Sequence, residues 1–148
     1  MLNLVRTNSE NKDFQKLTGL FDEFLIDIDG DEKEFFAQFN QIYIENVLIC
    51  YENEVALGCG AFKKLDSQTA EIKRMFVLPE GRGKGIATKI LTELEIWAKD
   101  SGYDSCILET SQKLESAIAL YRKYGYKDIP NYGQYIGVKS SMCMKKTF

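Results

Sequence analysis

The sequence predicts an α+β (mixed α/β) fold built on one mixed β-sheet flanked by helices. Three β-type segments, 47–51, 55–65 and 69–77, follow one another with short polar turns between them and therefore predict an antiparallel meander. Alternating strand and helix patterns follow them, which predicts a β-α-β-α unit in the second half. The length of 148 residues suits a single domain over residues 1–148.

The N-terminal third predicts a short strand and then helix. Residues 2–6 are apolar and read as a strand, and apolar side chains then recur every three or four positions over residues 10–28, which predicts a helix. The acidic run around Asp27–Glu32 ends that helix. Phe35, Phe36 and Phe39 predict a second short helix beyond it.

The C-terminal half contains the clearest amphipathic helix, over residues 84–101, with Gly102 placed to end it. The pattern then predicts a strand, a helix closed by Gly125 and two final strands, at 103–109, 117–124, 127–129 and 140–145. A Gly/Tyr-rich loop over 130–139 joins the last two strands.

Composition narrows the class of function. Hydrophobic residues make up 45% and charged residues 28%, as expected of a packed, soluble chain. No run approaches the roughly 18 apolar residues of a membrane span, and residues 1–6 are too short and too soon polar for a signal peptide. We therefore expect a cytoplasmic protein with no membrane partner, and the net charge of −3 argues against a nucleic-acid surface.

The chain contains no histidine, which removes Ser-His and Cys-His nucleophile pairs and the usual His-containing zinc sites. Cys50, Cys59, Cys106 and Cys143 lie in or beside apolar stretches without a Cys-x-x-Cys pair, so we expect core residues and no metal site. A general base must then be a carboxylate, a tyrosine, a lysine, a terminus or water.

A glycine turn stands where the helix of residues 84–101 begins. The first amides of a helix have no partner inside it and carry positive character, so Arg82–Ala87 reads as a pyrophosphate site. A P-loop fails because Leu78 stands where its first glycine is needed and Gly85 follows Lys84. A dinucleotide fingerprint is weak, because the turn follows an antiparallel meander.

Two motifs together identify a family. Arg82-Gly83-Lys84-Gly85-Ile86-Ala87 fits Arg/Gln-x-x-Gly-x-Gly/Ala, and residues 117–126 fit Ala-x-x-Leu-Tyr-x-x-x-Gly-Phe/Tyr. With the preceding Val77 and Pro79, the chain resembles the GNAT (GCN5-related) N-acetyltransferase superfamily over roughly residues 47–146. The resemblance implies the family's mostly antiparallel sheet, splayed between the strand 69–77 and the next one.

The resemblance also implies acetyl-CoA as cosubstrate, with no metal. The edge of the strand at Met75, Phe76 and Val77 would pair with the pantetheine arm. Backbone amides from Arg82 through Gly83, Lys84, Gly85, Ile86, Ala87 and Thr88 would hold the pyrophosphate, with added charge from Arg82 and Lys84. Homodimers are common in the family, so the resemblance allows one here.

The expected reaction is direct attack of a primary amine on the bound thioester in a ternary complex. By resemblance Tyr121 is the acid for the leaving thiolate. Glu71 and Glu109 each match a base used in part of the family, and Glu71 is slightly preferred; deprotonation relayed by water would leave both with indirect roles. A covalent acetyl-cysteine route is disfavoured because no cysteine has an evident activator. The alternatives are a non-catalytic CoA-binding regulatory domain of the same fold and a nucleotide-binding module.

Two features remain open. Many family members place an asparagine seven residues before the tyrosine, where this chain has Leu114. That CoA contact is then either missing or replaced, with Gln112 and Ser116 as the candidates. The acidic cluster from Asp27 to Glu34 fails as a calcium loop and reads as a solvated loop or as an attraction for cationic acceptors. The acceptor itself is not readable, and residues 10–46 and 130–139 are expected to shape its pocket.

Overall fold

A computed structural model describes residues 1–29 and 43–148. The second short helix expected at Phe35–Phe39 lies outside the described residues, as do Asp31, Glu32 and Glu34 of the acidic cluster. Within the described ranges, no helix is both long enough and apolar enough to cross a membrane.

One sheet organises the described chain, with its seven strands in the order β1-β2-β3-β4-β5-β7-β6. The strands are β1 (Leu2–Thr7), β2 (Asn46–Glu52), β3 (Val55–Lys64), β4 (Thr69–Val77), β5 (Ser105–Ser111), β6 (Lys127–Ile129) and β7 (Ser141–Thr147). All neighbouring pairs are antiparallel except β4 with β5, which is parallel. The predicted meander and the mixed sheet are therefore confirmed.

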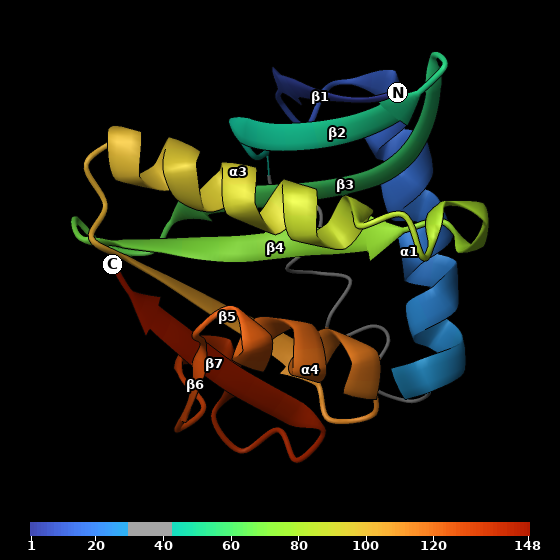
Figure 1. The fold of residues 1–148 in the computed structure, drawn as a ribbon. Helices are drawn as coiled ribbons and strands as arrows, with labels where there is room; N and C mark the ends of the chain where they lie inside the picture. Colours follow the sequence, from blue (N-terminus) through green and yellow to red (C-terminus); the bar gives the residue numbers. More distant parts are fainter. Residues whose placement is uncertain (30–42) are drawn as a thin grey trace.

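Helices cover both faces of this sheet (Figure 1). Helices α3 (Ile86–Asp100) and α4 (Glu115–Lys123) lie on one face, where Ile90, Leu91 and Leu94 are completely or almost completely buried. Helix α1 (Lys12–Asp29) packs Phe14 and Leu17 against the opposite face. Each stripe buries apolar side chains at helical spacing, which is the pattern that the sequence predicted.

Helix α3 begins two residues later than its periodicity suggested. Gly83 and Gly85 adopt positive φ angles of 81° and 77°, a left-handed backbone that cannot continue a right-handed helix. Gly85 is the N-cap and uses no side chain to cap the helix, so the turn leaves the helix start bare.

Strands β4 and β5 pair over a short stretch and then separate. Their register runs from Thr69 opposite Ser105 to Ile72 opposite Leu108. Beyond Ile72 the two strands diverge (Figure 1). On its other side β4 carries a bulge, because Ala61 pairs with Lys73 while Cys59 pairs with Phe76. Arg74, within the bulge, has φ of 57°. The predicted splay between these strands is confirmed.

The contact between β3 and α3 gives a test of the packing. A Cβ added at Gly60 would lie 2.6 Å from Met75 Sδ and 2.7 Å from Ile90 Cγ2. We predict that Gly60→Ala lowers the free energy of unfolding by about 1–3 kcal/mol, because the helix must move away from the sheet. In the matched control, a Cβ at Gly19 of α1 meets nothing within 4 Å. Gly19→Ala should therefore stabilise by about 0.5–1 kcal/mol. Urea denaturation followed by circular dichroism measures both, and equal effects would contradict the packing described.

Candidate active site

The divergence of β4 from β5 opens two adjoining hollows. The wider one, called here the groove, has a volume of about 640 Å³ and lies between the end of β4, the start of α3 and helix α4. The smaller one, called here the inner cavity, has a volume of about 100 Å³ and lies among β4, β5 and α1. Residues that border both are Phe21, Met75, Leu114, Ala117 and Tyr121. The two hollows therefore meet at Tyr121.

The groove gathers much of the predicted cofactor set. Met75, Phe76, Val77, Arg82 and Ala87 all line it, together with Tyr121. A phosphate-bearing chain could therefore lie along the β4 edge and end at the start of α3, where backbone amides point outward.

The glycine turn leaves its backbone accessible. A Cβ at Gly83 or Gly85 would meet nothing within 4 Å, so both glycines serve backbone conformation. The first hydrogen bond within α3 runs from the Lys89 amide to the Gly85 carbonyl, and the amides of residues 86–88, Thr88 included, precede it. The Ile86 side chain is buried in the core, so its amide is the group it can offer a ligand.

The two basic residues of the turn differ in what they contact. Lys84 Nζ lies 2.5 Å from Glu52 Oε1, and this partner holds the pKa of the Glu52 carboxyl below its usual range. Arg82 is exposed and borders the groove. Of the two charges expected at the phosphates, Arg82 is therefore the better placed.

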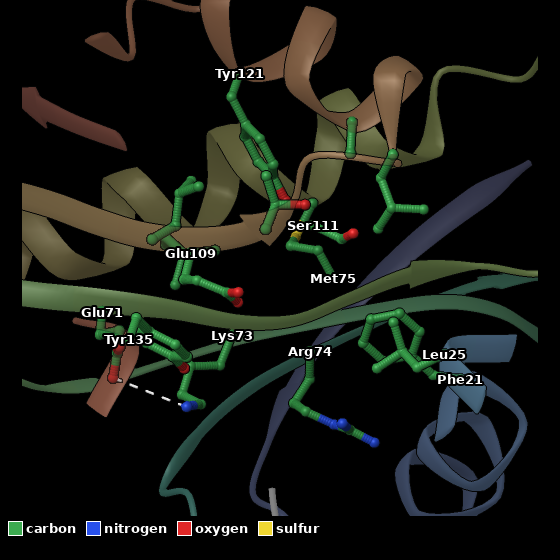
Figure 2. Close-up of a pocket in the computed structure, with 15 residues that line it drawn as sticks. Phe21, Leu25, Glu71, Lys73, Arg74, Met75, Glu109, Ser111, Tyr121 and Tyr135 are labelled. Atoms are coloured by element: carbon green, nitrogen blue, oxygen red, sulfur yellow. Dashed lines mark ion pairs between the residues drawn. The ribbon is translucent and has the colours of Figure 1, made fainter. Parts of the chain in front are cut away.

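Tyr121 is positioned by α4 and buried by its neighbours. Its ring packs edge-on against Tyr126 with centroids 5.7 Å apart. Burial, with a smaller contribution from the Glu109 charge, raises the pKa of Tyr121 well above its ordinary value. The phenol is therefore protonated at neutral pH. Figure 2 shows it reaching from α4 toward Met75 and Ser111.

Glu71 and Glu109, the two predicted bases, both line the inner cavity. Glu71 Oε2 accepts a hydrogen bond of 2.6 Å from the Tyr132 hydroxyl, and Glu71 Oε1 lies 3.9 Å from both Lys63 Nζ and Lys73 Nζ. Glu109 Oε2 accepts a hydrogen bond of 2.6 Å from the Ser141 hydroxyl. Loop 130–140 and the start of β7 thus hold both carboxylates.

Lys73 and Arg74 join the site without having been predicted. Lys73 is 6% exposed, and burial lowers the pKa of its amine against the opposing pull of Glu71 (Figure 2). The Arg74 guanidinium is 3% exposed, and its Nη2 contacts the Thr18 carbonyl and Asp22, each at 2.9 Å. Glu71 and Lys73 are two apart in one strand, and that spacing was the available signal for this pair.

The Arg74 guanidinium is also incompletely hydrogen-bonded. Its Nε and Nη1 atoms are buried with no hydrogen-bond partner in the described part of the chain. Each unpaired buried donor costs about 1–3 kcal/mol. Its φ of 57° adds backbone strain at the same residue.

The loop of residues 130–139 and the segment that follows β5 were both expected to contribute to the site. Tyr135 lines the inner cavity, and Tyr132 packs edge-on against it with centroids 5.5 Å apart. Gln112 points at this loop, where its Nε2 donates to the Lys139 carbonyl at 3.0 Å. Of the two candidate replacements for the missing asparagine, Ser116 lines the groove beside Leu114, and Gln112 does not line it.

The described ranges, 1–29 and 43–148, contain no group of three or more His, Cys, Asp or Glu side chains suited to hold an ion.

Comparisons with known proteins agree with this geometry. The model of the acetyltransferase (GNAT) family matches residues 12–126, and the chain belongs to that family. An IAA acetyltransferase of Azospirillum brasilense is 36% identical over 101 residues. That alignment covers 67% of this chain and 65% of the relative, so the chain spans less than two thirds of the relative's length.

Solved structures share the fold across the whole chain. A protein from Klebsiella pneumoniae subsp. pneumoniae MGH 78578, assigned as an acyl-CoA N-acyltransferase, superposes with a TM-score of 0.83 at 25% identity, covering 99% of this chain and 97% of its own. A GNAT family acetyltransferase from Elizabethkingia anophelis, solved with acetyl-CoA bound, gives a TM-score of 0.73 at 18% identity, with 99% and 98% covered.

The cysteines give a test of the direct route. All four are free and buried, and burial raises the pKa of Cys59 and of Cys106 to about 12 and that of Cys143 to about 11. Because the thiolate is the reactive form, native cysteines should react with Ellman's reagent about a hundredfold more slowly than in the unfolded chain. A Ser101→Cys variant, exposed at the end of α3, is the fast control. One native cysteine reacting as fast as that control would revive the covalent route.

Proposed function

We propose that the protein is an acetyl-CoA-dependent N-acetyltransferase that moves an acetyl group to a primary amine. The observation that carries the proposal is the position of Tyr121, a protonated phenol at the junction of the groove and the inner cavity. A thioester held in the groove would present its sulfur there, with the acceptor approaching from the inner cavity. Acetyl-CoA bound to the Elizabethkingia anophelis protein, which has the same fold, supports the donor.

The donor would be held mainly by backbone. The pyrophosphate would accept hydrogen bonds from the amides of residues 86–88 and the preceding turn, helped by the helix dipole and Arg82. The pantetheine arm has amide groups that can pair with the side of β4 left unpaired beyond Ile72. This mode needs few specific side chains, which suits a turn rich in glycine.

The chemistry follows from the groups that border the junction. The acceptor ammonium first loses a proton, because it has no free electron pair while protonated. The amine nitrogen then attacks the thioester carbon and the C–N bond forms. The nitrogen gives its second proton to the general base, and collapse of the intermediate breaks the C–S bond. The leaving thiolate takes the proton of the Tyr121 hydroxyl, and the phenol is restored from solvent.

Glu109 is the base in this proposal. Its charge is close enough to Tyr121 to contribute to the raised pKa of that phenol, so it lies near the reacting atoms. Both oxygens of Glu71 are engaged, by the Tyr132 hydroxyl and by two lysines. We therefore give Glu71 the role of holding Lys73 and Tyr132 in place.

Tyr121→Phe tests the leaving-group acid. We predict a fall in turnover of about 10²–10⁴-fold with little change in CoA affinity. Phenylalanine keeps the packing of the ring but removes the hydroxyl that donates the proton. CoA release over an amine panel gives turnover, and titration calorimetry gives affinity. Tyr124→Phe, at the C-cap of the same helix, is the matched control and should retain turnover. Equal turnover in the two variants would remove Tyr121 from the mechanism, and no heat with CoA for the wild type would remove the donor.

The pair Glu109→Gln and Glu71→Gln separates the two carboxylates. We predict that Glu109→Gln lowers kcat/KM by about 10²–10³-fold, as expected for loss of a general base. Glu71→Gln should lower turnover by less than about tenfold. It should also cost about 1–3 kcal/mol of stability, because Lys73 loses its buried partner. Kinetics and urea denaturation of both variants decide this, and the reverse order of turnover would make Glu71 the base.

A further inference from the structure

The buried cation on the wall of the inner cavity is the least satisfied polar group of the described chain. Arg74 combines a left-handed backbone with two buried nitrogens that lack partners. Both of its polar contacts fall on one nitrogen, Nη2. Native structures pair nearly all buried hydrogen-bond donors, so the two unpaired nitrogens of Arg74 indicate that a partner is missing.

Lys73 lies beside Glu71 in the inner cavity, whereas Arg74 lies apart from both carboxylates of the cavity (Figure 2). Figure 2 shows Glu71 and Glu109 on one side of the view and the Arg74 guanidinium on the other, beneath Phe21 and Leu25. Glu71 already pairs with Lys63 and Lys73, so Glu109 is the carboxylate assigned to an ammonium or amine. The guanidinium suits an anion, and carboxylate is the small anion that arginine pairs with best in proteins.

We propose that the acceptor is a small amino carboxylate, bound with its amine toward Glu109 and its carboxylate toward Arg74. This inference rests on the proposed function of the same site. The small volume of the cavity, about 100 Å³, favours a compact acceptor over a long peptide.

Two neighbours of Arg74 govern how the carboxylate reaches it. The Phe21 ring lies over the guanidinium, with the Arg74 Cζ 4.9 Å from the ring centroid, so the ring must rotate to uncover Nε or Nη1. Asp22 competes for the same cation, but its carboxylate is 47% exposed and contacts Nη2 alone. Removing the Asp22 charge should therefore strengthen the pull of Arg74 on an incoming carboxylate.

Matched acceptors test the proposal. Glycine, β-alanine and γ-aminobutyrate are each compared with their own carboxamide, and kcat/KM from CoA release is expressed per neutral amine to remove the difference in basicity. The series spans three separations of the two charges. For at least one length we expect the carboxylate to be preferred by about tenfold to a hundredfold, the range of a hydrogen bond to a charged group.

Three variants test whether Arg74 is responsible for the preference for a carboxylate. Arg74→Gln should bring that preference to about one, and Asp22→Asn should increase it. Arg6→Gln is the matched control, because Arg6 also pairs with a carboxylate, Glu93, and lies over an aromatic ring, that of Trp97. The preference should be unchanged in that control. Asp22→Asn keeps the test decisive if Arg74→Gln does not fold.

The outcomes distinguish this inference from the proposed function. Transfer to amines with no preference for any carboxylate, or a preference that neither Arg74→Gln nor Asp22→Asn alters, would overturn the inference and leave the acetyltransferase intact. If no amine is acetylated, saturation-transfer NMR with β-alanine and γ-aminobutyrate decides it. Contacts that appear in the wild type and vanish in Arg74→Gln support the anion site, and their absence in the wild type rejects it.

Discussion

The separation of β4 from β5 is the constraint on which the site depends. A parallel pair that stops at Ile72 and Leu108 leaves the far half of β4 hydrogen-bonded on one side alone, to β3. An open strand edge inside a sheet is a binding surface for an extended chain. The same separation makes room for the groove and for the inner cavity, so the proposed donor and acceptor sites would both arise from one break in the ladder.

The bulge in β4 sets which side chains face that break. Before the bulge, Ile72 faces the core under α3 while Glu71 and Lys73 face the other side of the sheet, and after it Met75 returns to the α3 side. Arg74 takes the left-handed conformation that makes the extra residue fit. Backbone strain therefore falls on a residue that lines the inner cavity, as is common near functional sites.

The residues around the groove could be predicted from the sequence, because they lie in short contiguous stretches. The turn at Arg82–Ala87 and the helix around Tyr121 are each contiguous, so residue spacing alone places their groups, and the meander and its turns follow from period-two patterns. The start of α3 was misplaced because periodicity does not register the positive φ of Gly85. Around the inner cavity, Glu71 and Glu109 were named from the family resemblance, and residues 10–46 and 130–139 were expected to contribute. Phe21 and Tyr135 could not be singled out, because they come from distant segments that only the packed sheet brings together.

The way these residues are distributed along the sequence has a consequence for the choice of acceptor. The hydroxyls of Tyr132 and Ser141 hold Glu71 and Glu109 from outside β4 and β5, and Asn131 fixes the loop by donating to the carbonyls of Tyr135 and Val138 at 3.1 Å. A change in this loop would therefore reshape the acceptor side through the carboxylates it holds. The donor side would be little affected, because its backbone contacts lie on the other side of Tyr121. One fold can thus keep a single thioester donor while its acceptor changes.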